Sequence, residues 1–74
     1  NMTNTTNKSG FEIRAELLNQ AHRMLSENNQ RAADEIYAHN DSYPNDKKGL
    51  KVSPILARDI VVVAKELNEF VTQQ

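Results

Sequence analysis

Two histidines and the acidic residues near them are the first side chains in this sequence that could do chemistry. His22 and His39 are 17 residues apart, and Asp34, Glu35 and Asp41 lie near the second of them. Imidazole and carboxylate groups bind transition metals, but known metal sites draw such ligands from shorter, recurring spacings. The pattern therefore predicts no metal site and no cofactor, and we expect His22 at the edge of a helix contact.

Motifs for covalent or acid–base catalysis are not found in the 74 residues. There is no nucleophile elbow, no Gly-rich phosphate loop and no pair of carboxylates arranged to share a proton. Gly10 and Gly49 are the only glycines, and a chain of this size has little room for a closed pocket. We therefore expect a protein that is not an enzyme.

A group of cations is the one polar feature that points to a ligand. It consists of Lys47, Lys48, Lys51 and Arg58, with Asp46 as the one acid among them. The group surrounds the predicted start of a helix, where the helix dipole also favours an anion such as a nucleic-acid phosphate. A solvated loop is the alternative, and the net charge of −1 and the lack of interleaved aromatic residues favour it.

Length and composition predict one small domain with a limited core. The chain is 38% hydrophobic and has no cysteine, so no disulfide adds to a core that supplies about 3–5 kcal/mol at this size. We therefore expect the chain to self-associate, which would add to the small hydrophobic core. No apolar run is long enough to span a membrane, and we expect a cytoplasmic protein. Residues 1–8 are polar and are expected to form a disordered tail before a helical domain of residues 9–74.

The most regular apolar pattern lies near the C-terminus and predicts a helix over about residues 54–72. Its stripe follows alternating steps of four and three residues: Leu56, Ile60, Val63, Leu67 and Phe70. Ser53 is a suitable N-cap, and Pro54 fits the first helical position because its missing N–H has no partner there in any case.

A longer helix is predicted over about residues 10–40, followed by a loop over 41–52. Ser9 and Glu12 have the spacing of a capping box, in which each side chain satisfies a backbone N–H of the other. The apolar stripe begins with Phe11, Leu18 and Leu25 and becomes thinner afterwards. Pro44 disfavours helix at the preceding residue and predicts the end of the helix.

The polar run of residues 27–30 leaves two interpretations of this first helix. Either the helix breaks at Asn28 and Asn29, or it continues, and the return of the same phase at Ala32 and Ile36 favours continuity. In a continuous helix, Asn29 lies either in a buried seam, where it fixes register, or on a thin part of the seam facing water.

The unequal helix lengths predict how the protein assembles. In an antiparallel hairpin the shorter helix cannot cover the longer one, and we expect the uncovered part to be the apolar N-terminal section, Phe11 to Ala21. Two copies would then form a four-helix bundle as a homodimer. The predicted core and dimer interface consists of Phe11, Leu18, Leu25, Leu56, Ile60, Val63, Leu67 and Phe70.

Two stretches of the sequence resemble a known group of proteins. Residues 11–18 (FEIRAELL) and residues 59–71 (DIVVVAKELNEFV) are similar to the two ends of short helical proteins encoded by T4-like tailed bacteriophages. The resemblance implies a viral origin and a host or phage protein as partner, but no activity and no site residues.

Together these features predict an all-α protein of two helices that acts as a protein-binding module. Nucleic-acid binding through the basic loop is the alternative function, and catalysis is the least supported.

Overall fold

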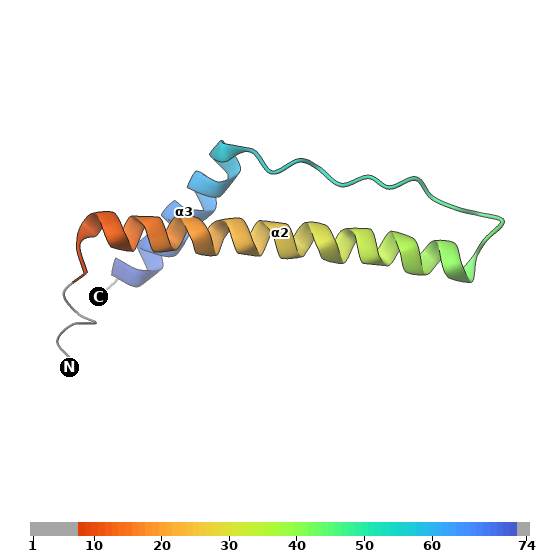
Figure 1. The fold of residues 1–74 in the computed structure, drawn as a ribbon, viewed down its shortest axis with the longest axis horizontal. Helices are drawn as coiled ribbons and strands as arrows, with labels where there is room; N and C mark the ends of the chain where they lie inside the picture. Colours follow the sequence, from red (N-terminus) through yellow and green to blue (C-terminus); the bar gives the residue numbers. More distant parts are fainter. Residues whose placement is uncertain (1–7, 73–74) are drawn as a thin grey trace.

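The computed structural model describes residues 8–72, so the predicted tail lies outside the described residues except for Lys8. Two α-helices, α2 (Gly10–Ser42) and α3 (Ala57–Thr72), make up the secondary structure of this range, which has no strand. They pack against each other in an antiparallel sense, with the end of α3 beside the start of α2 (Figure 1). This arrangement confirms the predicted all-α two-helix hairpin. In the described range neither helix is long and apolar enough to cross a membrane.

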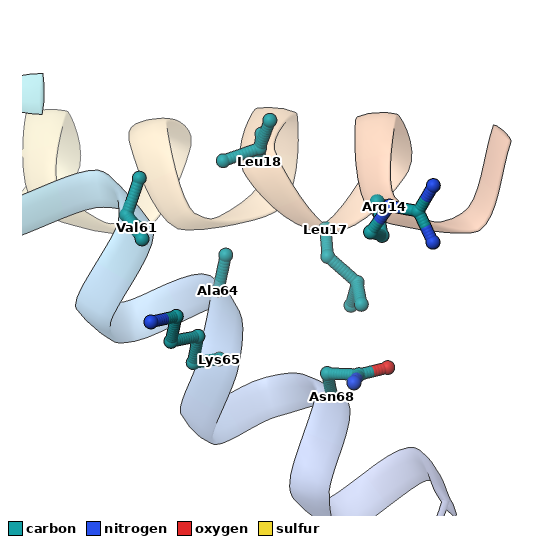
Figure 2. A pocket seen from close by; sticks show the side chains of 7 residues that line it. All are labelled: Arg14, Leu17, Leu18, Val61, Ala64, Lys65 and Asn68. Atoms are coloured by element: carbon teal, nitrogen blue, oxygen red, sulfur yellow. The ribbon is translucent and has the colours of Figure 1, made fainter. Parts of the chain in front are cut away.

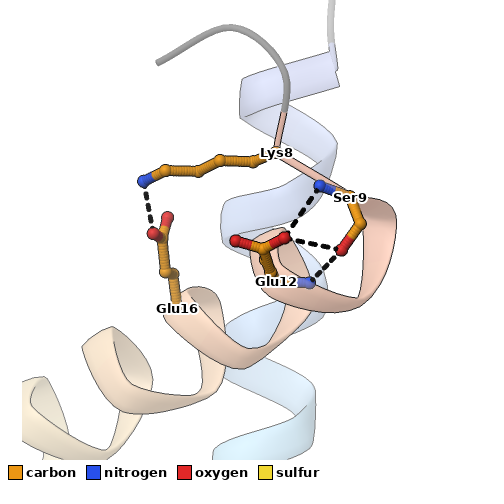
Figure 3. A network of polar contacts seen from close by, with 4 residues as sticks. All are labelled: Lys8, Ser9, Glu12 and Glu16. Atoms are coloured by element: carbon orange, nitrogen blue, oxygen red, sulfur yellow. Dashed lines mark hydrogen bonds and ion pairs between the residues drawn. The ribbon is translucent and has the colours of Figure 1, made fainter. Parts of the chain in front are cut away.

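The start of α2 is held by the predicted capping box (Figure 3). The Glu12 N–H donates to Ser9 Oγ at 3.1 Å, and the Ser9 N–H donates to Glu12 Oε1 at 3.5 Å. One turn further on, the Glu16 carboxylate pairs with the Lys8 amine. The hydrogen bond and the negative charge of Glu16 raise the pKa of Lys8 above its ordinary value.

Helix α2 continues without a break through residues 27–30, as the favoured interpretation predicts. It ends at Ser42, where the Tyr43 N–H still donates to the His39 carbonyl at 2.8 Å. The Asp46 N–H then closes a turn on the Tyr43 carbonyl at 2.9 Å. Pro44 lies inside this turn, since its ring cannot continue the helix.

The connection of residues 43–56 returns along α2 as an extended segment. The Asn40 side chain makes two hydrogen bonds to the backbone of this segment. Its Oδ1 accepts from the Lys48 N–H at 2.7 Å, and its Nδ2 donates to the Lys48 carbonyl at 3.0 Å. Further back along α2, Asn29 Nδ2 donates to the Ser53 carbonyl at 2.8 Å. The two asparagines are about 16 Å apart along the helix, which is the reach of five extended residues, so the connection between them is nearly straight.

Asn29 therefore takes neither of the two positions that the sequence suggests. It is half-buried, and its amide binds a backbone carbonyl of its own chain. An extended segment that pairs with no strand leaves its backbone groups without partners, and the asparagines of α2 supply them. Asn29 thus fixes the path of the connection in this chain.

Helix α3 begins at Ala57, three residues after the predicted start at Pro54. The Leu56 N–H donates to Asp59 Oδ2 at 3.0 Å, and the Leu56 carbonyl accepts the first helical hydrogen bonds, so Leu56 occupies the N-cap position. The assignment of Ser53 as N-cap is wrong. Its carbonyl is bound by Asn29, which holds this part of the chain extended.

The position of α3 along α2 also differs from the expectation. Helix α3 crosses the N-terminal half of α2 obliquely (Figure 1), and Ala21 in that half is fully buried. The prediction that Phe11 to Ala21 is the uncovered section is therefore wrong. The extended connection carries α3 back past the C-terminal half of α2, so α3 packs against the N-terminal half.

Candidate interaction site

The contact between the two helices buries very few side chains. Among residues 8–72 only Ala21 (0% exposed) and Ala64 (8% exposed) are buried. Every larger apolar side chain in this range is half-buried or exposed, and Phe70 at 77% and Phe11 at 73% are the most exposed. Small side chains at a crossing let two helices approach closely, but they bury little area. Of the apolar stripes predicted from the sequence, Phe11 and Phe70 are thus largely available for contact, and the other residues are partly available.

The direction in which α3 faces α2 explains this exposure. Residues of an α-helix are about 100° apart around its axis. Relative to the buried Ala64, the stripe residues Leu56, Val63 and Phe70 are then turned away by about 80–120°, all to the same side. Of the predicted stripe, Ile60 and Leu67 are nearest to the contact line, and both are half-buried. The stripe therefore faces sideways from the helix pair.

Apolar side chains of α2 continue this sideways surface. Ile13 and Met24 are turned from the buried Ala21 by about 60–80°, in the same sense of rotation as the stripe of α3. In an antiparallel pair, equal senses of rotation lead to the same side of the pair. We name this surface the lateral face, and it consists of Ile13, Met24, Leu56, Val63, Leu67 and Phe70. All six are exposed or half-buried.

A groove of about 180 Å³ lies between the helices on the other side of the contact. Leu17, Leu18, Val61 and Ala64 form its apolar part, while Arg14, Lys65 and Asn68 add polar groups (Figure 2). We name it the Arg14–Lys65 groove. Neither cation is part of an ion pair within the described residues.

The predicted interface residues are distributed over both sides of the helix pair. Leu56, Val63, Leu67 and Phe70 belong to the lateral face, and Leu18 lines the groove. Leu25 and Ile60 are half-buried near the helix contact, whereas Phe11 is exposed in the first turn of α2.

The four basic residues predicted as a nucleic-acid contact are not gathered around the start of α3. Lys48 is beside Asn40, near the far end of α2, whereas Arg58 follows the extended connection on α3. Nine residues lie between them, mostly in an extended conformation. The N-terminus of α3 already has a carboxylate, since Asp59 binds the Leu56 N–H. Lys48 and Lys51 line one shallow groove with Ile36 and Gly49, whereas Arg58 does not line it. Nucleic-acid binding stays a prediction, and the four cations do not form one site at the start of α3.

The two histidines have separate surroundings. His39 Nε2 donates to the Asp46 carbonyl at 2.8 Å, and its ring lies 5.0 Å from that of Tyr43, so it supports the turn after α2. His22 lines a shallow groove with Ala57 and Val61 at the edge of the helix contact. Within residues 8–72 no three His, Asp or Glu side chains are grouped in a way that could hold a metal ion.

Comparisons with protein families, with curated proteins and with solved structures find no match for this chain. The site is therefore argued from its geometry alone. Sequence reasoning missed the groove residues Arg14 and Lys65, because they lie beside the stripes. The signal that could have found them is the pair of alanines, Ala21 and Ala64, each within an otherwise bulky apolar pattern.

Proposed function

We propose that this chain is a small, non-catalytic protein–protein interaction module that forms a homodimer through its lateral face. The observation that supports the proposal is that only Ala21 and Ala64 are buried among the described residues. Most apolar side chains of the single chain remain partly in contact with water, so the free energy of burying their remaining exposed area is still available for association.

Phe70 shows the size of this contribution. A phenylalanine side chain buries about 150–250 Å² in an interface, and Phe70 is 77% exposed in the single chain. Burying its exposed area at about 25 cal/mol per Å² contributes about 3 kcal/mol per copy. A two-fold axis makes every contact twice, so the two Phe70 side chains together contribute about 6 kcal/mol. Association costs about 4–15 kcal/mol, and the remaining lateral-face residues offset the rest.

The dimer that fits the lateral face is a four-helix bundle. Each copy supplies a pair of antiparallel helices, and the two lateral faces become the inner layer between the pairs. The six residues of the lateral face are uncharged, which suits the centre of a homodimer interface, and Gln20 lies between Ile13 and Met24 on the same side of α2. Glu66 and Asp59 follow on α3 at about 140–160° from Ala64, where they would form a polar rim.

The other half of the proposal is motivated only by the resemblance of residues 11–18 and 59–71 to short helical proteins of T4-like bacteriophages. This resemblance suggests an accessory protein that acts on a phage or host protein in the host cytoplasm. The dimer would then be the binding unit, and its partner a second protein.

Light scattering coupled to size exclusion tests the dimer. We expect about twice the 8.4 kDa chain mass at micromolar concentration. The double variant Met24→Glu/Phe70→Glu should have the mass of one chain, because two carboxylates cannot be buried unpaired at a symmetric interface.

Val62→Glu is the matched control for this test. Val62 is also an exposed apolar residue of α3, but it lies about 160° from Ala64 and outside the lateral face. It should leave the dimer mass unchanged. A wild-type chain that stays monomeric, or a control that dissociates as readily as the double variant, would contradict the proposed interface.

A further inference from the structure

The Arg14–Lys65 groove lies on the opposite side of the helix contact from the lateral face, so it stays open in the proposed dimer. Its volume of about 180 Å³ is enough for one large apolar side chain, since an apolar cavity of about 150 Å³ holds a benzene ring. Leu17, Leu18, Val61 and Ala64 supply apolar contacts for such a side chain (Figure 2).

The charges at the rim of the groove have one sign. The Arg14 guanidinium and the Lys65 amine point away from each other at its two ends (Figure 2), and neither is in an ion pair within residues 8–72. The Arg14 guanidinium passes close to Gly10, where an added Cβ would lie 3.2 Å from Nη1, so the absence of a side chain at Gly10 leaves room for it.

An occupant that complements this groove has an apolar anchor with carboxylates on both sides of it. A short amphipathic helix with leucine or phenylalanine on one face and Asp or Glu beside it meets both conditions. A single-stranded nucleic acid fits less well, because the groove has no aromatic side chain on which a base could stack.

We propose that the Arg14–Lys65 groove binds an acidic amphipathic helix of a partner protein. This inference rests on the proposed function, since it names the chemistry of the partner. The apolar anchor fills the space between the helices, and its flanking carboxylates pair with Arg14 and Lys65. In the dimer two such grooves face outward, so one dimer binds two partner helices.

A pair of probe peptides tests the inference by fluorescence anisotropy. Both are 14-residue amphipathic peptides with leucine on the apolar face, and the polar positions are all glutamate in one and all lysine in the other. The wild-type protein should bind the glutamate probe at least about tenfold more tightly, as expected for two ion pairs replaced by two repulsive pairs. Binding should weaken as salt is added.

The double variant Arg14→Glu/Lys65→Glu should reverse this preference and bind the lysine probe more tightly. Arg23→Glu/Lys51→Glu is the matched control, because it changes the net charge equally at exposed cations outside the groove. All four positions are exposed, and circular dichroism melts check that each variant is folded. In NMR spectra of the wild type, the glutamate probe should shift the methyl signals of Leu18 and Val61.

Several results would overturn the inference. One is that a folded wild-type dimer does not bind the glutamate probe, and another is that it binds both probes equally. A third is that the Arg23→Glu/Lys51→Glu control also loses the preference for the glutamate probe. Loss of the dimer mass in the Arg14→Glu/Lys65→Glu variant would mean that a second copy occupies the groove. Tighter binding of a 20-nucleotide single strand than of the glutamate probe would assign the groove to nucleic acid. A monomer that binds the glutamate probe would contradict only the proposed dimer.

Discussion

The hydrogen bond from Asn29 to the Ser53 carbonyl should stabilise the extended connection between the two helices, and a substitution of Asn29 tests this. Replacing Asn29 with aspartate keeps the size and the helix propensity of the side chain but removes the N–H donor. The new carboxylate faces a carbonyl oxygen at the former hydrogen-bond distance of 2.8 Å. The extended connection, and with it the position of α3, should therefore be held less firmly. Leucine would be a poorer probe, because its better helix propensity offsets part of the loss.

The expected cost follows from the two effects. A lost hydrogen bond of this kind destabilises a protein by about 0.5–1.5 kcal/mol, and the repulsion between two oxygens at a half-buried site adds to it. We expect a total of about 1–2 kcal/mol for Asn29→Asp, which corresponds to a fall in Tm of about 5–15 °C for a chain of this size. Asn28→Asp is the control, since Asn28 is exposed and makes no such contact, and its effect should stay within about 0.5 kcal/mol.

The same variant has a predicted pH dependence. A protonated carboxyl can donate to the Ser53 carbonyl, whereas the ionised form cannot, so the pKa of the new group is raised in the folded state. A raised pKa means that the interaction is present below the pKa of the unfolded chain, about 3.9, and is lost as the pH rises through the folded value. Thermal melts of the two variants should thus differ at pH 7 and converge below about pH 4. Equal melts at pH 7 would refute the role of Asn29 in holding the connection.

Three further predictions concern the ends and the stripe of the helices. Leu67→Asp should leave most of the chain unfolded by circular dichroism. It removes about 2–3 kcal/mol of hydrophobic stabilisation from a protein whose total free energy of unfolding is about 3–5 kcal/mol. Lys65→Asp should keep the helicity of the wild type. Ser9→Ala should lower stability by about 1 kcal/mol in denaturant titration through loss of the capping box, and an unchanged midpoint would argue against it. Glu16→Gln should bring the pKa of Lys8 down toward its ordinary value in an NMR titration. This ion pair should contribute to stability at neutral pH and cease to do so as the pH rises through the raised pKa of Lys8.

Much of the fold could be predicted from the sequence because local signals determine it. The step of three and four residues fixes both helices, and the spacing of Ser9 and Glu12 fixes the start of α2 to the residue. Continuity through Asn28 and Asn29 follows from the phase of Ala32 and Ile36, which a break would have shifted. Each of these features depends on residues within a few turns of each other.

The features that could not be predicted depend on contacts between distant residues. Asn29 and Ser53 are 24 residues apart, and their hydrogen bond holds Ser53 in the extended connection, outside α3. Periodicity shows that a helix has an apolar stripe, but it does not show which edge of the stripe faces the neighbouring helix. That choice is made where Ala21 and Ala64 allow the two helices to approach most closely.

The direction of α3 links these contacts to the proposed function. If the stripe from Leu56 to Phe70 faced α2 directly, a single chain would bury its largest side chains and have little need of a second copy. In the observed orientation of α3, the small Ala64 side chain packs against α2 and Phe70 points outward. This orientation also places Lys65 and Arg14 at the two ends of the groove on the other side. One rotation of α3 thus yields an uncharged lateral face suited to an identical copy, and a basic groove suited to an acidic partner. Replacing Ala64 with a bulky residue should therefore disturb both surfaces together, whereas the Met24→Glu/Phe70→Glu and Arg14→Glu/Lys65→Glu variants should each affect only one.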